Sequence, residues 1–120
     1  MIGGFILGGN PANAQVAIRG IGPSLSQFGL ANVLSDPVLE LRDHNGTLLG
    51  SNDNWTDDPL SAAQLMFHGL ALQDLHESGI FTSLPPGVKE QVLAMPAEAL
   101  TRLTIDLVHA QSLEELHLTD

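Results

Sequence analysis

The sequence predicts a mainly β protein, an incomplete antiparallel β-sandwich with a short α-helical C-terminal segment. Three observations predict this fold class. Short stretches that alternate apolar and polar residues recur through residues 1–87, separated by clusters of Gly, Pro, Asn and Asp. An Asn-Gly pair joins two of these stretches, which is a strong local signal for a β-hairpin. After Gly87 the apolar residues follow a helical spacing instead.

The composition is that of one globular, turn-rich domain. A chain of 120 residues can bury one modest core, and 12 Gly and 7 Pro supply many turns. The chain has no cysteine, which excludes disulfides, cysteine-ligated metals and thiol catalysis. No apolar stretch reaches the length of a membrane span, so we expect no membrane insertion.

The charge is strongly acidic. There are 14 acidic residues against 4 basic ones, which gives a net charge of −10 with neutral histidines. Such a chain repels phosphate groups, so nucleic acid and anionic membrane surfaces are excluded as partners. Acidic residues gather between residues 36 and 58, which favours a cation as ligand over an anion.

Two strands are predicted near the start of the chain. The first covers residues 2–7, between two glycine pairs, and the second covers residues 15–22. In the second strand, Val16 and Ile18 are expected to point inward and Arg19 outward. An irregular connection follows over residues 22–37, and its apolar residues are expected to cap the core: Leu25, Phe28, Leu30, Val33 and Leu34.

The clearest predicted element is a hairpin over residues 37–53. Two alternating stretches flank His44, Asn45 and Gly46. Because Asn and Gly both tolerate a positive φ, the pair predicts a type I′ turn.

A short helix is predicted over residues 56–68. Asp57 or Asp58 suits its N-cap, Pro59 its first position and Gly69 its exit. The apolar residues Leu60, Ala63 and Phe67 would share one face of it. A strand around residues 80–81 is expected next, ending at the Pro-Pro-Gly turn of residues 85–87.

Residues 88–120 predict helices. Leu100, Leu103, Leu107 and Val108 fall on one helical stripe, and Pro96 suits a first turn. We therefore place a boundary at Gly87, with a β-sandwich-like module at residues 1–87 and a helical segment at residues 88–120 that packs on the module or trails from it.

Several motifs in order resemble those of a known module. They are FILGGN, VAIRGIGPSL, LSDPVLELRDHNGTLLGSNDNW and ESGIFTSLPPG. Together they resemble a bacterial secreted β-sandwich repeat module, and the hairpin part is similar to bacterial pre-peptidase C-terminal domains. The resemblance covers about residues 1–87. It implies a non-catalytic, extracellular or cell-surface accessory domain, often one of several in a long polypeptide.

The chain departs from that resemblance after the Pro-Gly turn. In the family two further strands follow there, whereas residues from Val88 onward have helical spacing here. Without these closing strands the module is truncated, and strand edges and an apolar face are left exposed. Either the C-terminal helices or another chain is expected to cover that face.

The acidic, Asn-rich hairpin region predicts a calcium site. Calcium takes about six to eight oxygen ligands, which carboxylates and Asn carbonyls can supply. The candidate ligands are Asp43, Asn45, Asn52, Asp53, Asn54 and Asp57. The spacing of an EF-hand is absent, and Asn and Asp also populate turns through local hydrogen bonds, so a turn without an ion explains the same residues. No cofactor other than calcium is expected.

No catalytic constellation is recognisable. The histidines lack the paired spacing of a zinc site, and Ser24 lies outside any nucleophile elbow. Trp55 suits a sugar platform or, more commonly, the closed end of a core. The chain is therefore not expected to be an enzyme.

Three functions are compatible with these observations. The first is a non-enzymatic structural or accessory module of a bacterial secreted or cell-surface protein, stabilised by calcium. The second is a protein-interaction module that uses an exposed strand edge or the C-terminal helices to bind other domains of a longer polypeptide or a protein partner. The third is an accessory fragment of a hydrolase. An extracellular location follows from the resemblance alone, because residues 1–9 have the pattern of a strand and not of a signal peptide.

Overall fold

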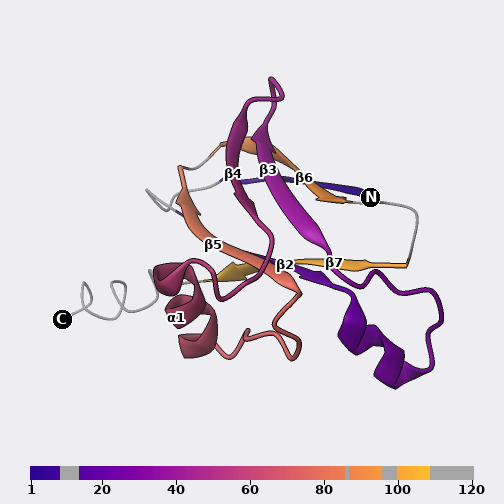
Figure 1. Ribbon diagram of the computed structural model, residues 1–120. Coiled ribbons are helices and arrows are strands. Elements are labelled where there is room, and N and C mark those ends of the chain that lie inside the picture. Colours follow the sequence, from indigo (N-terminus) through magenta and orange to yellow (C-terminus); the bar gives the residue numbers. More distant parts are fainter. Residues whose placement is uncertain (9–13, 86, 96–99, 109–120) are drawn as a thin grey trace.

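Two antiparallel β-sheets pack face to face in the protein (Figure 1). The computed structural model describes residues 1–8, 14–85, 87–95 and 100–108. One sheet has the strand order β1-β6-β3-β4 and the other the order β5-β2-β7. The strands are β1 (Ile2–Ile6), β2 (Ala14–Ile21), β3 (Val38–Asp43), β4 (Leu48–Asn52), β5 (Ser78–Leu84), β6 (Lys89–Met95) and β7 (Arg102–Val108). The predicted mainly β, antiparallel fold class is confirmed.

The main core lies between the two sheets. Side chains on the inner faces of both sheets form one buried cluster, with Ile18 from β2, Leu39 and Leu41 from β3, and Val92 and Ala94 from β6. Each is at most 2% exposed. The predicted inward orientation of Val16 and Ile18 is confirmed.

A second apolar layer covers the outer face of the three-stranded sheet. The helix α1 (Pro59–Phe67) lies on the side of that sheet that faces away from the four-stranded one (Figure 1). Ala17 of β2 packs there with Trp55 and with Leu65 of α1. Trp55 is therefore part of the core, as a lone Trp beside a hairpin commonly is.

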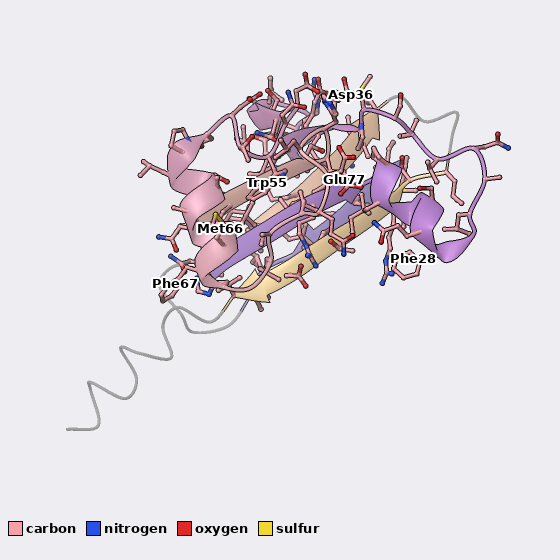
Figure 2. The ribbon with its side chains drawn as sticks, turned by 60° about the horizontal axis from the view of Figure 1, so that its bottom comes forward. Phe28, Asp36, Trp55, Met66, Phe67 and Glu77 are labelled. Carbon is pink, nitrogen blue, oxygen red and sulfur yellow. The ribbon has the colours of Figure 1, made fainter. Side chains whose placement is uncertain are left out.

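The helix is confirmed, and its two faces can now be assigned. Asp58 accepts a hydrogen bond from the Leu60 N–H as the N-cap, and Pro59 is the first helical residue. Leu60, Ala63 and Phe67 do share a face, but that face is exposed to solvent. The buried face consists of Ser61, Ala62 and Leu65. Figure 2 shows Phe67 at the end of the helix, on its outer side.

The hairpin is confirmed, but the predicted turn type is wrong. Gly46 has a φ of 85°, whereas Asn45 lies outside the positive-φ region that a type I′ turn requires. The Gly46 N–H donates to the Asp43 carbonyl, and the Asp43 N–H donates to the Thr47 carbonyl. This is a three-residue loop in which a left-handed glycine follows a tight turn.

The prediction of helices after Gly87 is wrong for Lys89–Met95 and Arg102–Val108. Both stretches are strands, and each is paired within one of the two sheets. β6 pairs with β1 on one side and β3 on the other, and β7 pairs with β2. The rest of the predicted helical segment, residues 96–99 and 109–120, lies outside the described residues.

Pairing on both sides explains why β6 is a strand despite its composition. Lys, Glu, Gln, Leu, Ala and Met all favour helices, but tertiary context overrides such propensities. Burial in β6 alternates residue by residue, with Glu90, Val92 and Ala94 inside. An acidic residue at an inward position conceals this alternation in the sequence.

The connection between β2 and β3 caps the core with fewer residues than predicted. It contains a 3₁₀-helix, η1 (Pro23–Phe28). Leu25 and Leu34 are buried, but Phe28 and Leu30 are exposed. Within the described ranges, no helix has the length and apolar character needed to cross a membrane.

The contact between α1 and the three-stranded sheet can be tested with Leu65→Ala. Leu65 is 0% exposed, so we expect its truncation to lower the free energy of unfolding by about 2–5 kcal/mol. The matched control is Leu60→Ala in the same helix, where the side chain is 80% exposed and the change should stay within about 0.5 kcal/mol. Urea denaturation followed by circular dichroism measures both. Equal effects would mean that α1 does not pack as described.

Candidate functional site

The six predicted calcium ligands lie at two different ends of the hairpin. Asp43 and Asn45 are at its tip, whereas Asn52 ends β4 and pairs with Leu39, four residues before Asp43 on β3. At the strand rise per residue, this separates the two groups by about 13 Å. They therefore do not converge on one ion.

The two ligands at the tip are engaged in the turn. Asp43 Oδ1 accepts hydrogen bonds from the backbone N–H groups of Asn45 and Thr47, each at 2.9 Å. These bonds lower the pKa of Asp43, the bond from Thr47 having the largest effect. Asp43 thus shapes the hairpin by the local bonding typical of Asp in turns.

The remaining four ligands lie where the chain leaves β4. The side chain of Asn52 accepts a hydrogen bond from the Gly79 N–H at 2.9 Å, and the Asn54 carbonyl accepts one from the Asp57 N–H. Desolvation raises the pKa of Asp53, and Asp36 raises it further through its charge and a hydrogen bond, while the charge of His76 lowers it.

The described part of the chain contains no group of three or more His, Cys, Asp or Glu side chains placed to hold a metal ion. Calcium binding stays a prediction, and the hairpin geometry restricts its ligands to one end at a time.

The most unusual polar group is Glu90 in β6. It points to the inner face of the four-stranded sheet together with Val92 and Ala94, and it is 1% exposed. Neither of its carboxyl oxygens has a hydrogen-bond partner among the described residues. Because a buried charge without a partner is costly, burial raises the pKa of Glu90.

Glu90 lines a cavity of about 780 Å³ at the hairpin end of the sandwich. This volume falls within the range of small-molecule pockets. The apolar part of the wall comes from Leu49 of β4, Leu84 of β5, and Pro85 and Val88. The polar part comes from Asp43, His44, Lys89 and Glu90.

Two carboxyl groups face each other across strands at this cavity. Asp43 and Glu90 are directly paired between β3 and β6, so their side chains lie on the same face of the sheet. Like charges at directly opposed positions repel each other. Accordingly, the charge of Asp43 raises the pKa of Glu90 further, and His44 acts in the opposite direction.

A second buried glutamate, Glu77, uses one of its carboxyl oxygens, Oε2, to hold the surrounding loops, whereas its Oε1 has no hydrogen-bond partner among the described residues. It is 0% exposed, and its Oε2 accepts bonds from the Gly22 N–H at 2.7 Å, the Ser24 N–H at 3.0 Å and the Ser24 hydroxyl at 2.7 Å. Its carbonyl also accepts a bond from the Trp55 N–H. Figure 2 shows Glu77 beside the 3₁₀-helix that begins at Pro23. One residue thus joins the η1 connection to the segment that follows β4.

The Gly-Pro-Ser motif of residues 22–24 owes its composition to this arrangement. A Cβ at Gly22 would overlap the Leu34 carbonyl oxygen, so only glycine fits there. The Ser24 hydroxyl donates a hydrogen bond to Glu77 Oε2. The sequence contained both motifs, GPSL and ESGIF, but no spacing rule links residues so far apart in the chain.

No family model, no curated protein and no solved structure matches the chain.

The role of Glu77 predicts that Ser24→Ala destabilises the protein by about 1.5–3 kcal/mol, because a hydrogen bond to a charged group is lost. Ser26→Ala is the matched control, since the Ser26 hydroxyl donates to the Pro23 carbonyl at the surface and its loss should cost at most about 0.5 kcal/mol. In a double-mutant cycle with Glu77→Gln, we expect a coupling of at least about 0.5 kcal/mol, measured by urea denaturation. Additive effects would contradict the contact.

The raised pKa of Glu90 predicts that Glu90→Gln stabilises the folded protein, and that the size of this effect depends on pH. A carboxyl whose pKa is higher in the folded than in the unfolded state destabilises the protein when it is ionised. That penalty disappears as the pH falls through the folded pKa towards the usual value of 4.5. The variant should therefore unfold at a higher temperature than the parent at pH 7, and the difference should shrink on acidification.

Thermal unfolding from pH 7 to pH 4 measures this difference. Glu40→Gln is the control, because Glu40 lies on the outer face of the same sheet in an ion pair with Arg42 at 2.9 Å, and its replacement should not raise stability. A destabilised Glu90→Gln variant at pH 7 would mean that the Glu90 carboxylate has partners in solution.

Proposed function

We propose that the protein is a non-enzymatic accessory module whose function is to bind a ligand in the cavity at the hairpin end of the sandwich. The observation that carries this proposal is Glu90, a buried carboxyl without a hydrogen-bond partner in the described structure, in the wall of the pocket at the hairpin end of the sandwich. Buried polar groups are nearly always paired, so an unpaired one in a cavity wall suggests that a ligand completes the pairing.

The composition of the cavity wall favours binding over catalysis. Its lining includes two carboxyl groups and a histidine together with Lys89, whose side chain points away, and none of the described lining residues carries a hydroxyl group. Asp43 is already engaged by two backbone N–H groups, which leaves it poorly suited to move protons. Apolar walls with a few polar groups are typical of sites that hold a ligand in place.

The two sheets make this end of the sandwich a stable platform. β3 and β6 pair through six residues and supply Asp43 and Glu90 from neighbouring strands, while Leu84 comes from the opposite sheet. Sites on paired strands hold their side chains more precisely than sites on loops. This suits an accessory module of the kind implied by the resemblance to bacterial secreted proteins, attached to other domains or to a protein partner.

A neutral probe tests whether the cavity binds at all. In ¹⁵N-edited NMR titrations with n-pentanol, we expect the largest shifts at backbone amides lining the cavity, from Asp43–His44 and Val88–Glu90. Leu49→Arg, which places a long charged side chain at the mouth, should abolish these shifts. The control Leu60→Arg, on the exposed face of α1, should leave them unchanged. Shifts that cluster instead around Leu25, Phe28 and Leu100 would show that the probe binds in a smaller groove there, which would contradict the proposal.

A further inference from the structure

We propose that the ligand of the cavity is a primary ammonium group on an aliphatic stem, the chemistry of a lysine side chain or a free alkylamine. This inference rests on the proposed function and specifies its ligand. Glu90 and Asp43 are the counter-charges, and the apolar wall holds the stem.

The two carboxyl groups favour a ligand with a positive charge. Asp43 and Glu90 lie opposite each other on neighbouring strands, where two negative charges destabilise the sheet. A cation between them removes this repulsion and gives the buried Glu90 carboxylate an opposite charge. The protein as a whole has a net charge of −10, which also draws cations towards it.

The unused hydrogen-bond acceptors favour an ammonium over a guanidinium group. Both oxygens of Glu90 are free of partners in the described structure, whereas Oδ1 of Asp43 is occupied by the turn. An ammonium is a compact charge with three donors that can reach acceptors on two different strands. A guanidinium is a planar fork that suits two oxygens of one exposed carboxylate. The two oxygens of Glu90 on β6 and the carboxyl of Asp43 on β3 are acceptors on neighbouring strands, and this arrangement suits an ammonium group better.

The apolar side chains of the cavity wall favour a ligand with an aliphatic chain. Leu49, Leu84, Pro85 and Val88 come from both sheets and the turn that connects β5 to β6. Leu49 is half-exposed, so a ligand that covers it removes apolar surface from water. A bare metal ion gains nothing from these residues, whereas an aliphatic chain does.

The two basic groups at the cavity do not occupy the place of the cation. Lys89 precedes Glu90 in β6, so its side chain points to the opposite face of the sheet, where it is paired with Ile6 of β1. Neither Lys89 nor His44 makes an ion pair with Glu90 or Asp43 in the described structure. The charge of His44 only partly offsets that of the two carboxyl groups, and neither carboxyl has an ion-pair partner among the described residues, so the position between them is open to a ligand.

Binding has a conformational requirement. The carboxyl oxygens of Glu90 are buried, so the side chain must turn from the wall towards the cavity to meet an ammonium group. The carboxyl must also be ionised. Because its pKa is raised, affinity for an amine should fall as the pH is lowered towards the pKa of Glu90, whereas affinity for a neutral alcohol should not.

Paired probes of equal length test the ligand class. We expect n-pentylamine to bind at least about tenfold more tightly than n-pentanol in NMR titrations, because it adds charge-assisted hydrogen bonds. In Glu90→Gln the amine should lose this advantage while the alcohol binds as before. Glu40→Gln removes one acidic group from the outer face of the same sheet and should keep the preference. The Glu90→Gln spectrum itself shows whether the variant is folded.

Two further probes distinguish the sources of the amine. If the ligand is a lysine of a polypeptide, N-acetyl-lysine amide binds as tightly as n-pentylamine or more tightly, and N-acetyl-norleucine amide binds weakly. If it is a free amine, the blocked lysine binds less tightly than n-pentylamine. Either result supports an ammonium ligand.

The possible failures are separable. Equal affinities of n-pentylamine and n-pentanol at the cavity, or an amine preference that survives Glu90→Gln, would overturn the ligand class and leave the cavity as a binding site. Tighter binding of n-pentylguanidine than of n-pentylamine would overturn the choice of ammonium. The absence of cavity shifts with every probe would overturn the proposed function as well.

Discussion

The fold depends on the burial of β2 on both of its faces. Val16 and Ile18 point into the space between the two sheets, and Ala17 points to α1 and Trp55 on the other side. Three consecutive residues are therefore at most 1% exposed. β2 also has a hydrogen-bonded neighbour on each edge, β5 and β7. Every other layer of the protein is positioned relative to this strand.

Small residues make this double burial possible. Gly79 of β5 lies beside Leu65 and Trp55, and a Cβ there would approach Leu65 to 2.9 Å. Ala17 leaves room for the same two side chains. The helix can thus approach the sheet closely, which excludes water from its outer face.

Two buried glutamates show how differently one residue type can be used. Glu77 accepts three hydrogen bonds at Oε2 and holds loops together, so the burial of that oxygen is compensated, while its Oε1 has no partner among the described residues. Glu90 is buried to the same degree without such bonds. A fold of this size has little stability to spare, and an uncompensated acid in its wall is the natural place to look for a function.

The sequence predicted elements whose signals are local. The hairpin follows from Asn45–Gly46, and α1 follows from Asp58, Pro59 and Gly69, because caps and turns depend on neighbouring residues. Strands β6 and β7 were not predicted because their strand structure depends on pairing with partners far away in the sequence, such as β1 for β6 and β2 for β7. The candidate site was not predicted from the sequence for the same reason. Asp43 was recognised, but its true neighbour, Glu90, is brought to it only by the sheet.

The arrangement of β6 between β1 and β3 has a consequence for how the chain folds during its synthesis. β1 has β6 as its strand partner, and β3 has β6 on the edge away from β4. Until β6 leaves the ribosome, β1 has no partner and β3 has one open edge. The β3–β4 hairpin can form early, because its strands are close in sequence, but β1 can pair only after β6 has been made. Closing such long loops makes folding slow. Until β6 pairs, the unpaired edges of β1 and β3 are open to aggregation.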